Sequence, residues 1–180
     1  PDLAIGEQVT YHLTATLSEG TQTLVIADTL PTGLTFVSGR VVSVGAGLPG
    51  SLSGTTPTVN GQGVTFDFGT VVNTGNNIAG DGTVVVEIIG RVADVASNQP
   101  GTVLTNAGSA TVTSPTNPTA PGGTLTDGDS TSADVVAPAL DIAKTVDHLT
   151  GDAGDLFTYT VTVTQQAGSS GPAYGVVVVD

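Results

Sequence analysis

The sequence predicts an all-β protein that folds as an antiparallel β-sandwich, with one full domain followed by the opening strands of a second. Three observations carry this prediction. Threonine and valine, which favour strands, are among the dominant residues, and 25 glycines with 10 prolines punctuate them. Many segments alternate apolar and polar residues with a period of two. No segment has a convincing apolar period of 3.6 residues, so short strands joined by turns are expected.

The expected strands of the first domain alternate with turns rich in glycine, proline, serine and asparagine. They span residues 7–17, 23–28, 34–44, 64–72, 83–95 and 102–114, and residues 132–138 close the domain. The longest connections, residues 45–63 and 115–131, are expected to be loops because they combine glycine and proline with small polar residues.

A proline corner joins the second and third expected strands. Leu30, Pro31, Thr32 and Gly33 are predicted to form a β-turn, with the proline at its second position and the glycine at its fourth. Asp28 ends the strand before this corner, where its carboxylate is predicted to cap the amides of the turn. A bulge or kink is expected at Gly39 in the strand that follows.

The chain repeats part of itself after about 150 residues, which is the length of one domain. The segment GEQVTYHLTATL at residues 6–17 matches GDLFTYTVTVTQ at residues 154–165, and LVIAD, ending at Asp28, matches VVVVD, ending at Asp180. The inward residues Val9, Tyr11, Leu13 and Ala15 correspond to Phe157, Tyr159, Val161 and Val163. The two copies are therefore expected to have the same inward face.

The phase of the repeat predicts two domains. Residues 1–137 form a sandwich that lacks its own first strand, whereas residues 138–180 are the opening strands of the next repeat, or strands donated to a neighbouring subunit. A bare apolar strand such as residues 175–180 is an aggregation hazard unless another strand covers it. The expected assembly strands are marked by Ala139, Leu140, Ile142, Phe157, Tyr159, Val161, Val177 and Val179.

Several of these stretches resemble a known surface repeat of bacteria and archaea, the domain of unknown function 11. The resemblance rests on DIAKTVD, GDLFTYTVTV, VIADTLPTGL and TVLTNAGSATVT, and it covers most of the chain. It departs at residues 7–8, which are Glu-Gln, and in the long middle loops. The resemblance implies an immunoglobulin-like sandwich with Greek-key connections, within very large, repetitive cell-surface proteins, and it implies no enzymatic activity.

Charge and composition limit the classes of partner. The formal net charge is −13, which repels nucleic-acid phosphates and disfavours anionic membranes. Cysteine, methionine and tryptophan are absent, so disulfides and thiol chemistry are excluded and a required cofactor is not expected. No apolar run is long enough to span a membrane. An extracellular, cell-surface location fits this composition.

Acidic residues in two segments are candidates for calcium binding. Asp127, Asp129 and Asp134 are expected in one flexible loop, and Asp152 and Asp155 lie at the junction to the second copy. Calcium takes six to eight oxygen ligands, which such loops can supply. Ordinary turn chemistry is the better interpretation, because aspartate is a common turn residue and no regular calcium-loop register is present.

Three further features offer little support for catalysis. Residues 45–50, GAGLPG, match a dinucleotide-binding pattern, but the sequence after them does not predict the helix that such a site needs. His12 and His148 are the only histidines and are expected to be solvated. Lys144, the only lysine, is a conceivable partner for Asn106 in an amide crosslink of the kind that sandwich adhesins form, although a surface lysine is the simpler interpretation.

The sequence therefore predicts a structural repeat of an extracellular fibre, surface layer or giant adhesin stalk, and no enzyme. Its expected partners are neighbouring copies of the same repeat, in a homopolymer or a tandem array, which pair strands or stack head to tail. The alternative is a ligand-binding adhesin module that recognises glycan or protein. The low aromatic content, 4%, disfavours a glycan site because sugars commonly stack on exposed rings.

Overall fold

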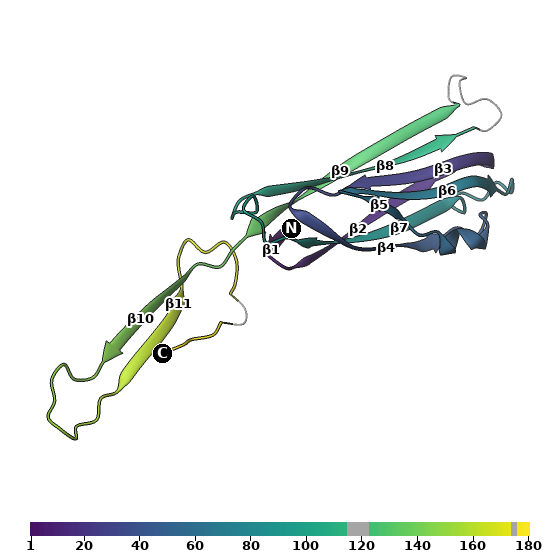
Figure 1. The fold of residues 1–180 in the computed structure, drawn as a ribbon. Coiled ribbons are helices and arrows are strands. Elements are labelled where there is room, and N and C mark those ends of the chain that lie inside the picture. The colour runs from purple at the N-terminus through teal and green to yellow at the C-terminus, as the bar shows by residue number, and fades with distance from the viewer. Residues whose placement is uncertain (115–122, 174–175) are drawn as a thin grey trace.

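The computed structural model describes residues 1–114, 123–173 and 176–180, which form a two-layer β-sandwich followed by a two-stranded hairpin (Figure 1). The larger sheet has the strand order β1-β9-β8-β3-β6-β5, and the smaller sheet has the order β2-β7-β4. The strands are β1 (Asp2–Ala4), β2 (Gln8–Thr16), β3 (Gly20–Thr29), β4 (Leu34–Val44), β5 (Thr58–Asn60), β6 (Gly63–Asn73), β7 (Thr83–Val92), β8 (Val103–Thr113), β9 (Thr124–Val136), β10 (Leu140–Val146) and β11 (Tyr159–Gln165). The predicted all-β sandwich is confirmed.

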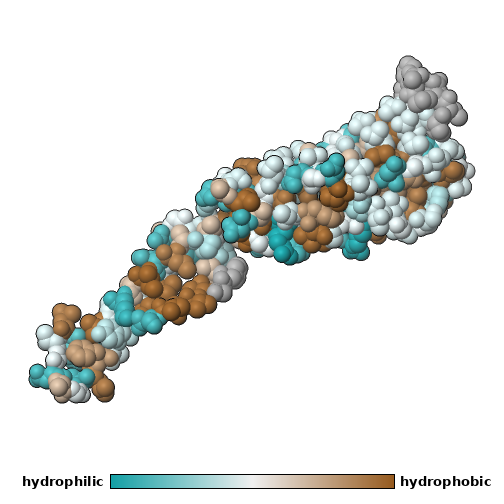
Figure 2. Space-filling view, in the orientation of Figure 1, coloured by the Kyte–Doolittle hydropathy of each residue, from teal (hydrophilic) through white to brown (hydrophobic). Residues whose placement is uncertain are grey.

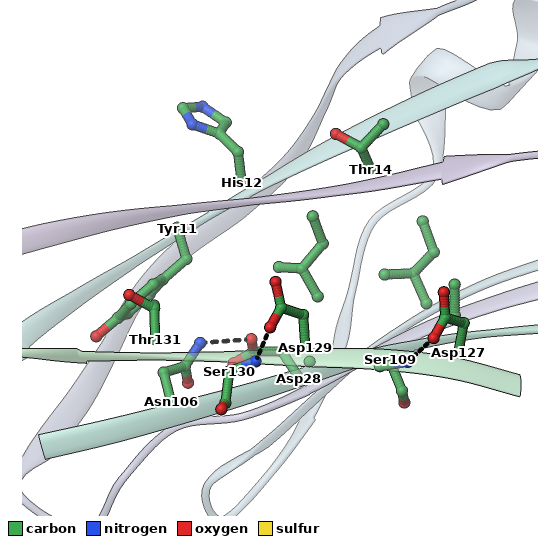
Figure 3. A pocket seen from close by; sticks show the side chains of 15 residues that line it. Tyr11, His12, Thr14, Asp28, Asn106, Ser109, Asp127, Asp129, Ser130 and Thr131 are labelled. Carbon is green, nitrogen blue, oxygen red and sulfur yellow. Dashed lines mark hydrogen bonds between the residues drawn. The ribbon is translucent and has the colours of Figure 1, made fainter.

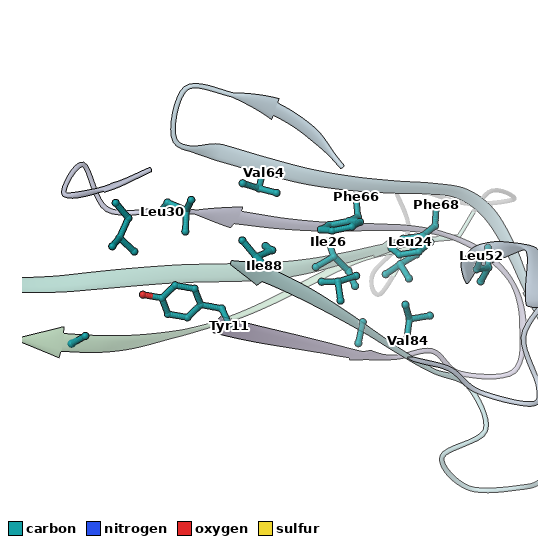
Figure 4. Close-up of a cluster of buried hydrophobic side chains, with 14 of the residues drawn as sticks. Tyr11, Leu24, Ile26, Leu30, Leu52, Val64, Phe66, Phe68, Val84 and Ile88 are labelled. Carbon is teal, nitrogen blue, oxygen red and sulfur yellow. The ribbon is translucent and has the colours of Figure 1, made fainter. Parts of the chain in front are cut away.

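The core lies between the two sheets and follows from the period of two (Figure 4). Every second residue of β7, including Val84, Val86 and Ile88, is fully buried. Phe66 on β6 faces them from the other sheet, and Tyr11 and Ala15 on β2 are buried as the alternation predicts. Burial of these apolar side chains is the main stabilising contribution to the sandwich.

Most strand pairs are antiparallel, but β1 pairs with β9 in parallel. The register of this parallel ladder sets Asp2 against Asp134 and Ala4 against Val136. A short strand therefore does precede β2, but it belongs to the larger sheet. Among the described residues β2 pairs only with β7, so its other edge is open.

The predicted proline corner is correct in place but shifted by one residue. The amide of Leu34 donates to the carbonyl of Pro31 at 2.8 Å, so Pro31 is the first residue of the turn instead of the second. The expected irregularity at Gly39 falls beside it, where the register against β7 shifts between Phe36 and Ser38. The extra residue of such a bulge strengthens the local twist of the strand.

Both predicted long loops contain regular structure. Residues 45–63 include a 3-10 turn, η1 (Gly50–Gly54), which buries Leu52, and the short strand β5. Of the second predicted loop, residues 115–122 lie outside the described part of the chain, whereas residues 124–131 belong to β9. This 13-residue strand pairs with β8 from Val103 to Thr113, so tertiary pairing overrides the turn propensity of its aspartates and glycine.

The second unit consists of β10 and β11, which extend away from the end of the sandwich (Figure 1). Two parts of it differ from the prediction. Phe157 precedes β11, and residues 176–180 form no strand ladder among the described residues. In the first unit the matching strand, β3, lies between β6 and β8, and the described residues of 138–180 form no counterpart of either partner.

The only helical element in the described part of the chain is η1, and no helix there is long and apolar enough to cross a membrane.

Candidate functional site

A buried acid and a buried amide face each other on neighbouring strands of the larger sheet. Asp28 on β3 is 3% exposed and Asn106 on β8 is 4% exposed. The Asn106 Nδ2 group donates to Asp28 Oδ2 at 2.7 Å. Asp28 therefore does not cap the proline corner as predicted; it points into the sandwich. The signal was present in the sequence, because Leu24, Ile26, Asp28 and Leu30 occupy successive inward positions.

Three buried polar atoms, two in this pair and one in the neighbouring Tyr11, have no hydrogen-bond partner among the described residues. They are Asp28 Oδ1, Asn106 Oδ1 and the hydroxyl of Tyr11. Leaving a buried polar atom without a partner costs about 1–3 kcal/mol, so native proteins rarely cluster such atoms. A group of them in one place is a functional-site signal.

These residues line a cavity of about 420 Å³ between β2 and the β8–β9 ladder (Figure 3). Tyr11 and Leu13 border it from β2, whereas His12 and Thr14 point away from Asp28 (Figure 3). Its solvent side is formed by exposed residues of β9. The cavity thus connects the buried acid with the open edge of β2.

The environment of Asp28 favours its protonated form. Burial raises the pKa of the Asp28 carboxyl above its ordinary value of 3.8, and the hydrogen bond from Asn106 opposes this only partly. The pKa of Tyr11 is also raised, first by burial and second by the negative charge of Asp28. A cation placed in this cavity would relieve the cost of the buried carboxylate.

We expect Asp28→Asn to stabilise the sandwich near neutral pH by about 1–3 kcal/mol, since it removes a buried charge and keeps an acceptor for Asn106. Because the folded state holds the proton of Asp28 more tightly, wild-type stability falls as the pH rises from 3.8 through the raised pKa. The variant should lack this slope and match the wild type below pH 3.8. Urea unfolding across pH 3–7 measures both effects. A pKa difference of one unit between the folded and unfolded states corresponds to about 1.4 kcal/mol of stability.

Asp94→Asn is the matched control, because Asp94 is exposed and its substitution makes the same change in net charge. The ionisable groups that line the same cavity are Tyr11, His12, Asp127 and Asp129. If the stability of the wild type rises with pH relative to that of Asp28→Asn, the raised pKa of Asp28 is contradicted.

The second unit contains the counterpart of this acid, and there a lysine contacts it. Asp180 matches Asp28 in the internal repeat, and the Lys144 ammonium donates to Asp180 Oδ1. The Lys144 Nζ atom also lies 4.8 Å from the ring centroid of Tyr159, which matches Tyr11. The side chains of Lys144 and Asp180 are 46% and 58% exposed, so this pair lies near solvent.

Lys144 and Asn106 are not brought together within the chain. Lys144 lies on β10 in the projecting hairpin, and Asn106 lies inside the sandwich on β8 (Figure 1). Each instead contacts an aspartate from the same position of the repeat, Asp180 and Asp28 respectively.

Three of the predicted calcium ligands do not lie in the flexible loop that the sequence predicts for them. Asp127, Asp129 and Asp134 lie on strand β9, where Asp127 and Asp129 accept hydrogen bonds from the next amide along the chain. Asp152 and Asp155 form a turn in which the Asp152 amide donates to Asp155 Oδ2 at 2.6 Å. In the described ranges no three acidic or histidine side chains gather closely enough to hold a metal ion.

The dinucleotide-like segment serves a structural purpose. The Gly45 amide donates to the Thr83 carbonyl at 2.7 Å, and the Gly47 amide donates to the Asp81 carbonyl at 3.0 Å. Leu48 is buried, and the segment is followed by the five-residue 3-10 turn η1. The glycines therefore let this segment approach the start of β7, and no helix N-terminus of the kind that holds phosphate is formed.

Both histidines are exposed, as predicted, and pair with acids. His12 Nε2 lies 3.1 Å from Glu87 Oε2, and His148 Nδ1 lies 3.1 Å from Asp147 Oδ1. Arg40 bonds the same glutamate at 2.8 Å and lowers its pKa, which makes this group an exposed ion-pair cluster.

The predicted assembly strands are only partly regular, but their apolar side chains are uncovered. Val161 opposes Lys144 and is half-buried, whereas Leu140, Ile142, Phe157 and Tyr159 are exposed. Val177 and Val179 are 81% and 89% exposed, and Ala139 accepts a backbone hydrogen bond from Gln166 at 2.8 Å. We call residues 138–165 with 176–180 the hairpin surface.

Structural similarity places this chain among immunoglobulin-like sandwiches. The major pilin subunit BcpA of Bacillus cereus matches with a TM-score of 0.52 and 14% identity, over 92% of this chain and 51% of the pilin. The N-terminal domain of the Streptococcus gordonii adhesin Sgo0707 matches with a TM-score of 0.50 and 12% identity, over 75% of this chain and 30% of that one.

A C-terminal fragment of the major pilin GBS80 of Streptococcus agalactiae matches with a TM-score of 0.50 and 11% identity, over 78% of this chain and 54% of the fragment. The chain thus spans about half the length of the pilin structures that it matches. At these identities the likeness establishes the fold. No family model and no curated protein matches the sequence, so the resemblance to the domain of unknown function 11 stays a prediction.

Proposed function

We propose that this chain is a structural unit of an extracellular surface fibre or stalk, and that neighbouring units join through the hairpin surface. The observation that carries the proposal is the uncovered apolar face of the second unit, which Figure 2 shows as a concentration of hydrophobic side chains beyond the sandwich. Soluble monomers rarely expose contiguous apolar patches of this kind, and such patches mark interaction sites.

The geometry of the hairpin supports strand pairing as the mode of contact. On β10, Leu140, Ile142 and Val146 share one face with the stem of Lys144, because side chains two residues apart point the same way. On β11, Val161 and Val163 lie opposite Lys144 and Ile142. An isolated two-stranded hairpin is marginally stable in water, so this surface gains stability when a further strand or sheet covers it.

The architecture also fits a fibre. The sandwich and the hairpin follow each other end to end, which extends the molecule along one direction (Figure 1). The neighbours with solved structures include pilin subunits, and this supports the proposal at the level of fold. A surface location and partners of the same type are parts of this proposal.

The adhesin alternative has less support from the surface. The large exposed aromatic residues in the described ranges, Phe157 and Tyr159, both belong to the second unit. No aromatic patch therefore lies on the described loops of the sandwich, where a ligand site would be expected.

The proposal predicts that Ile142→Asp weakens self-association of the 1–180 chain at least tenfold. The substitution places a charge on a face that must lose water, and about 1.4 kcal/mol corresponds to tenfold in affinity. Sedimentation at several concentrations measures the association. Thr145→Asp is the control, because it adds the same charge to the other face of β10. A wild-type chain that stays monomeric at all concentrations, or equal effects of both variants, would contradict the proposal.

A further inference from the structure

Three segments of the chain meet at the end of the sandwich opposite the hairpin, where β6 connects to β7 (Figure 1). The connection, residues 74–82, contacts Glu19 in the turn between β2 and β3, and it also contacts Gly47. The Thr74 amide donates to the Gly47 carbonyl at 2.9 Å, and the Gly47 amide donates to the Asp81 carbonyl at 3.0 Å. Glu19, Asn73 and Asp81 all line a hollow of about 260 Å³ at this end.

Asn73, the last residue of β6, presents a buried oxygen atom without a partner. The side chain is 3% exposed, and its Nδ2 group donates to the Leu17 carbonyl at 3.0 Å. This bond fixes which end of the carboxamide is the donor and leaves Oδ1 on the other side. Asn73 Oδ1 is buried and has no hydrogen-bond partner among the described residues. A buried acceptor of this kind requires an explanation, and a bound water or ion is a common one.

The carboxylate of Asp81 approaches the same place. A β-carbon on Gly47 would lie 2.6 Å from Asn73 Oδ1 and 2.7 Å from Asp81 Oδ2, so both oxygen atoms lie close to one point beside the bare Gly47 backbone. Asp81 Oδ2 accepts a hydrogen bond from Asn76 Nδ2 at 2.6 Å, whereas Asn73 Oδ1 has no donor. Two neighbouring oxygen atoms that both carry negative charge repel each other, and a cation that binds both removes this cost.

Glu19 brings a second carboxylate to the hollow. Its Oε1 atom accepts a hydrogen bond from the Asn76 amide at 2.8 Å and another from the Asn77 amide. Asn76 therefore joins the two acids, because its backbone amide donates to Glu19 and its side chain donates to Asp81. Glu19 Oε2 accepts no hydrogen bond from the described residues and remains available as a ligand.

This set of oxygen atoms suits calcium. Carboxylates and neutral carboxamide oxygens are typical calcium ligands, and water can complete the six to eight positions because the hollow borders the exposed residues Asn77 and Ile78. No cysteine is present in the chain and neither histidine lines the hollow, which disfavours softer metals. The site has two acids, which is compatible with the absence of three gathered acidic or histidine side chains from the described ranges.

We propose that Glu19, Asn73 and Asp81 form a calcium site at this end of the sandwich. The ion would fix the connection between β6 and β7, which belong to different sheets, to the turn between β2 and β3. It would thereby hold the two layers together at one end. Extracellular modules bind calcium with dissociation constants of about 10⁻⁴–10⁻³ M, and two carboxylates beside open water belong in this range. The site goes beyond the proposed fibre role and does not depend on how units join.

The test is calcium binding by the whole 1–180 chain after removal of metal with a chelator, measured by calorimetry in about 150 mM sodium chloride. We expect one ion per chain. Calcium at about ten times the dissociation constant should raise the midpoint of thermal unfolding by a few degrees, because the ion binds the folded state. Glu19→Gln and Asp81→Asn should each weaken binding at least tenfold, because each removes a charged ligand.

The two substitutions are chosen to separate the ligand from the loop. Glutamine keeps an acceptor for the Asn76 and Asn77 amides, and asparagine keeps an acceptor for Asn76 Nδ2. Without calcium, both variants should therefore unfold at or above the midpoint of the wild type, since one of two neighbouring negative charges is removed. In calcium the order should reverse.

Asp127→Asn is the matched control, because it makes the same change in net charge at an exposed position on β9. A chain with a net charge of −13 attracts a diffuse layer of cations, and the control measures this effect. If Asp127→Asn weakens calcium binding as much as Asp81→Asn does, the inference is overturned. It is also overturned if about 10 mM calcium gives neither binding heat nor a shift in the wild-type midpoint, and a water is then the partner of Asn73 Oδ1. Neither result would affect the proposed assembly.

Discussion

Phe66→Ala is expected to lower the free energy of unfolding of the sandwich by about 3–5 kcal/mol, the range for removing a fully buried phenylalanine. The side chain is 0% exposed and lies on β6 of the larger sheet, facing the smaller one. It also stacks on Phe68, with a ring-centroid distance of 6.4 Å. Because β6 is paired with β3, and β3 is paired in turn with β8, these strands can close the resulting cavity only partly.

Urea unfolding followed by circular dichroism measures this loss. Phe157→Ala is the matched control, because the same atoms are removed from a side chain that is 41% exposed and lies outside any strand. We expect the control to change stability by less than about 1 kcal/mol. Equal losses for both variants would show that Phe66 is not part of the core.

Gly45→Ala is expected to destabilise the fold by about 3 kcal/mol, at the upper end of the range for overpacking. A β-carbon at this position would lie 2.0 Å from the carbonyl oxygen of Asp81, which belongs to the backbone and cannot rotate away. The substitution would also separate the Gly45 amide from the Thr83 carbonyl, now 2.7 Å apart. The start of β7 would have to move.

Gly50→Ala serves as the comparison, since a β-carbon there would meet no atom within 4 Å. Thermal unfolding of the two variants should differ by several degrees, because 1 kcal/mol shifts the midpoint by about 2–4 °C in a domain of this size. A Gly45→Ala protein as stable as Gly50→Ala would mean that the loop relaxes freely and that the close approach is not required.

The strand pattern was largely predictable because burial imposes a local period of two. In β2, Tyr11 and Ala15 are buried between exposed threonines, as the sequence alone indicates. Strand β9 was not predictable, because aspartate, glycine and serine have low strand propensity. It forms because β8 offers an uninterrupted edge and threonine hydroxyls meet across the ladder, as Thr111 and Thr126 do at 3.0 Å.

The candidate site was predictable in its residue types but not in its arrangement. Lys144 and Asn106 were paired as chemical partners, and the internal repeat related Asp28 to Asp180. The sequence could not show that Asn106 and Asp28 lie on adjacent strands. That arrangement depends on the pairing of β3 with β8, and the two residues are 78 positions apart in the chain. Nor does a composition rich in loop aspartates reveal that three of them lie on a strand.

The parallel pairing of β1 with β9 determines how tension would act on the sandwich. The two strands run side by side from Asp2 and Asp134, and β9 continues directly towards the hairpin. A pull on residue 1 and on residue 137 in opposite directions would slide these strands past each other. Their hydrogen bonds would then resist together as a sheared patch instead of opening one by one. Forced unfolding is governed by the height of the unfolding barrier, so this short strand could raise rupture force without adding much equilibrium stability.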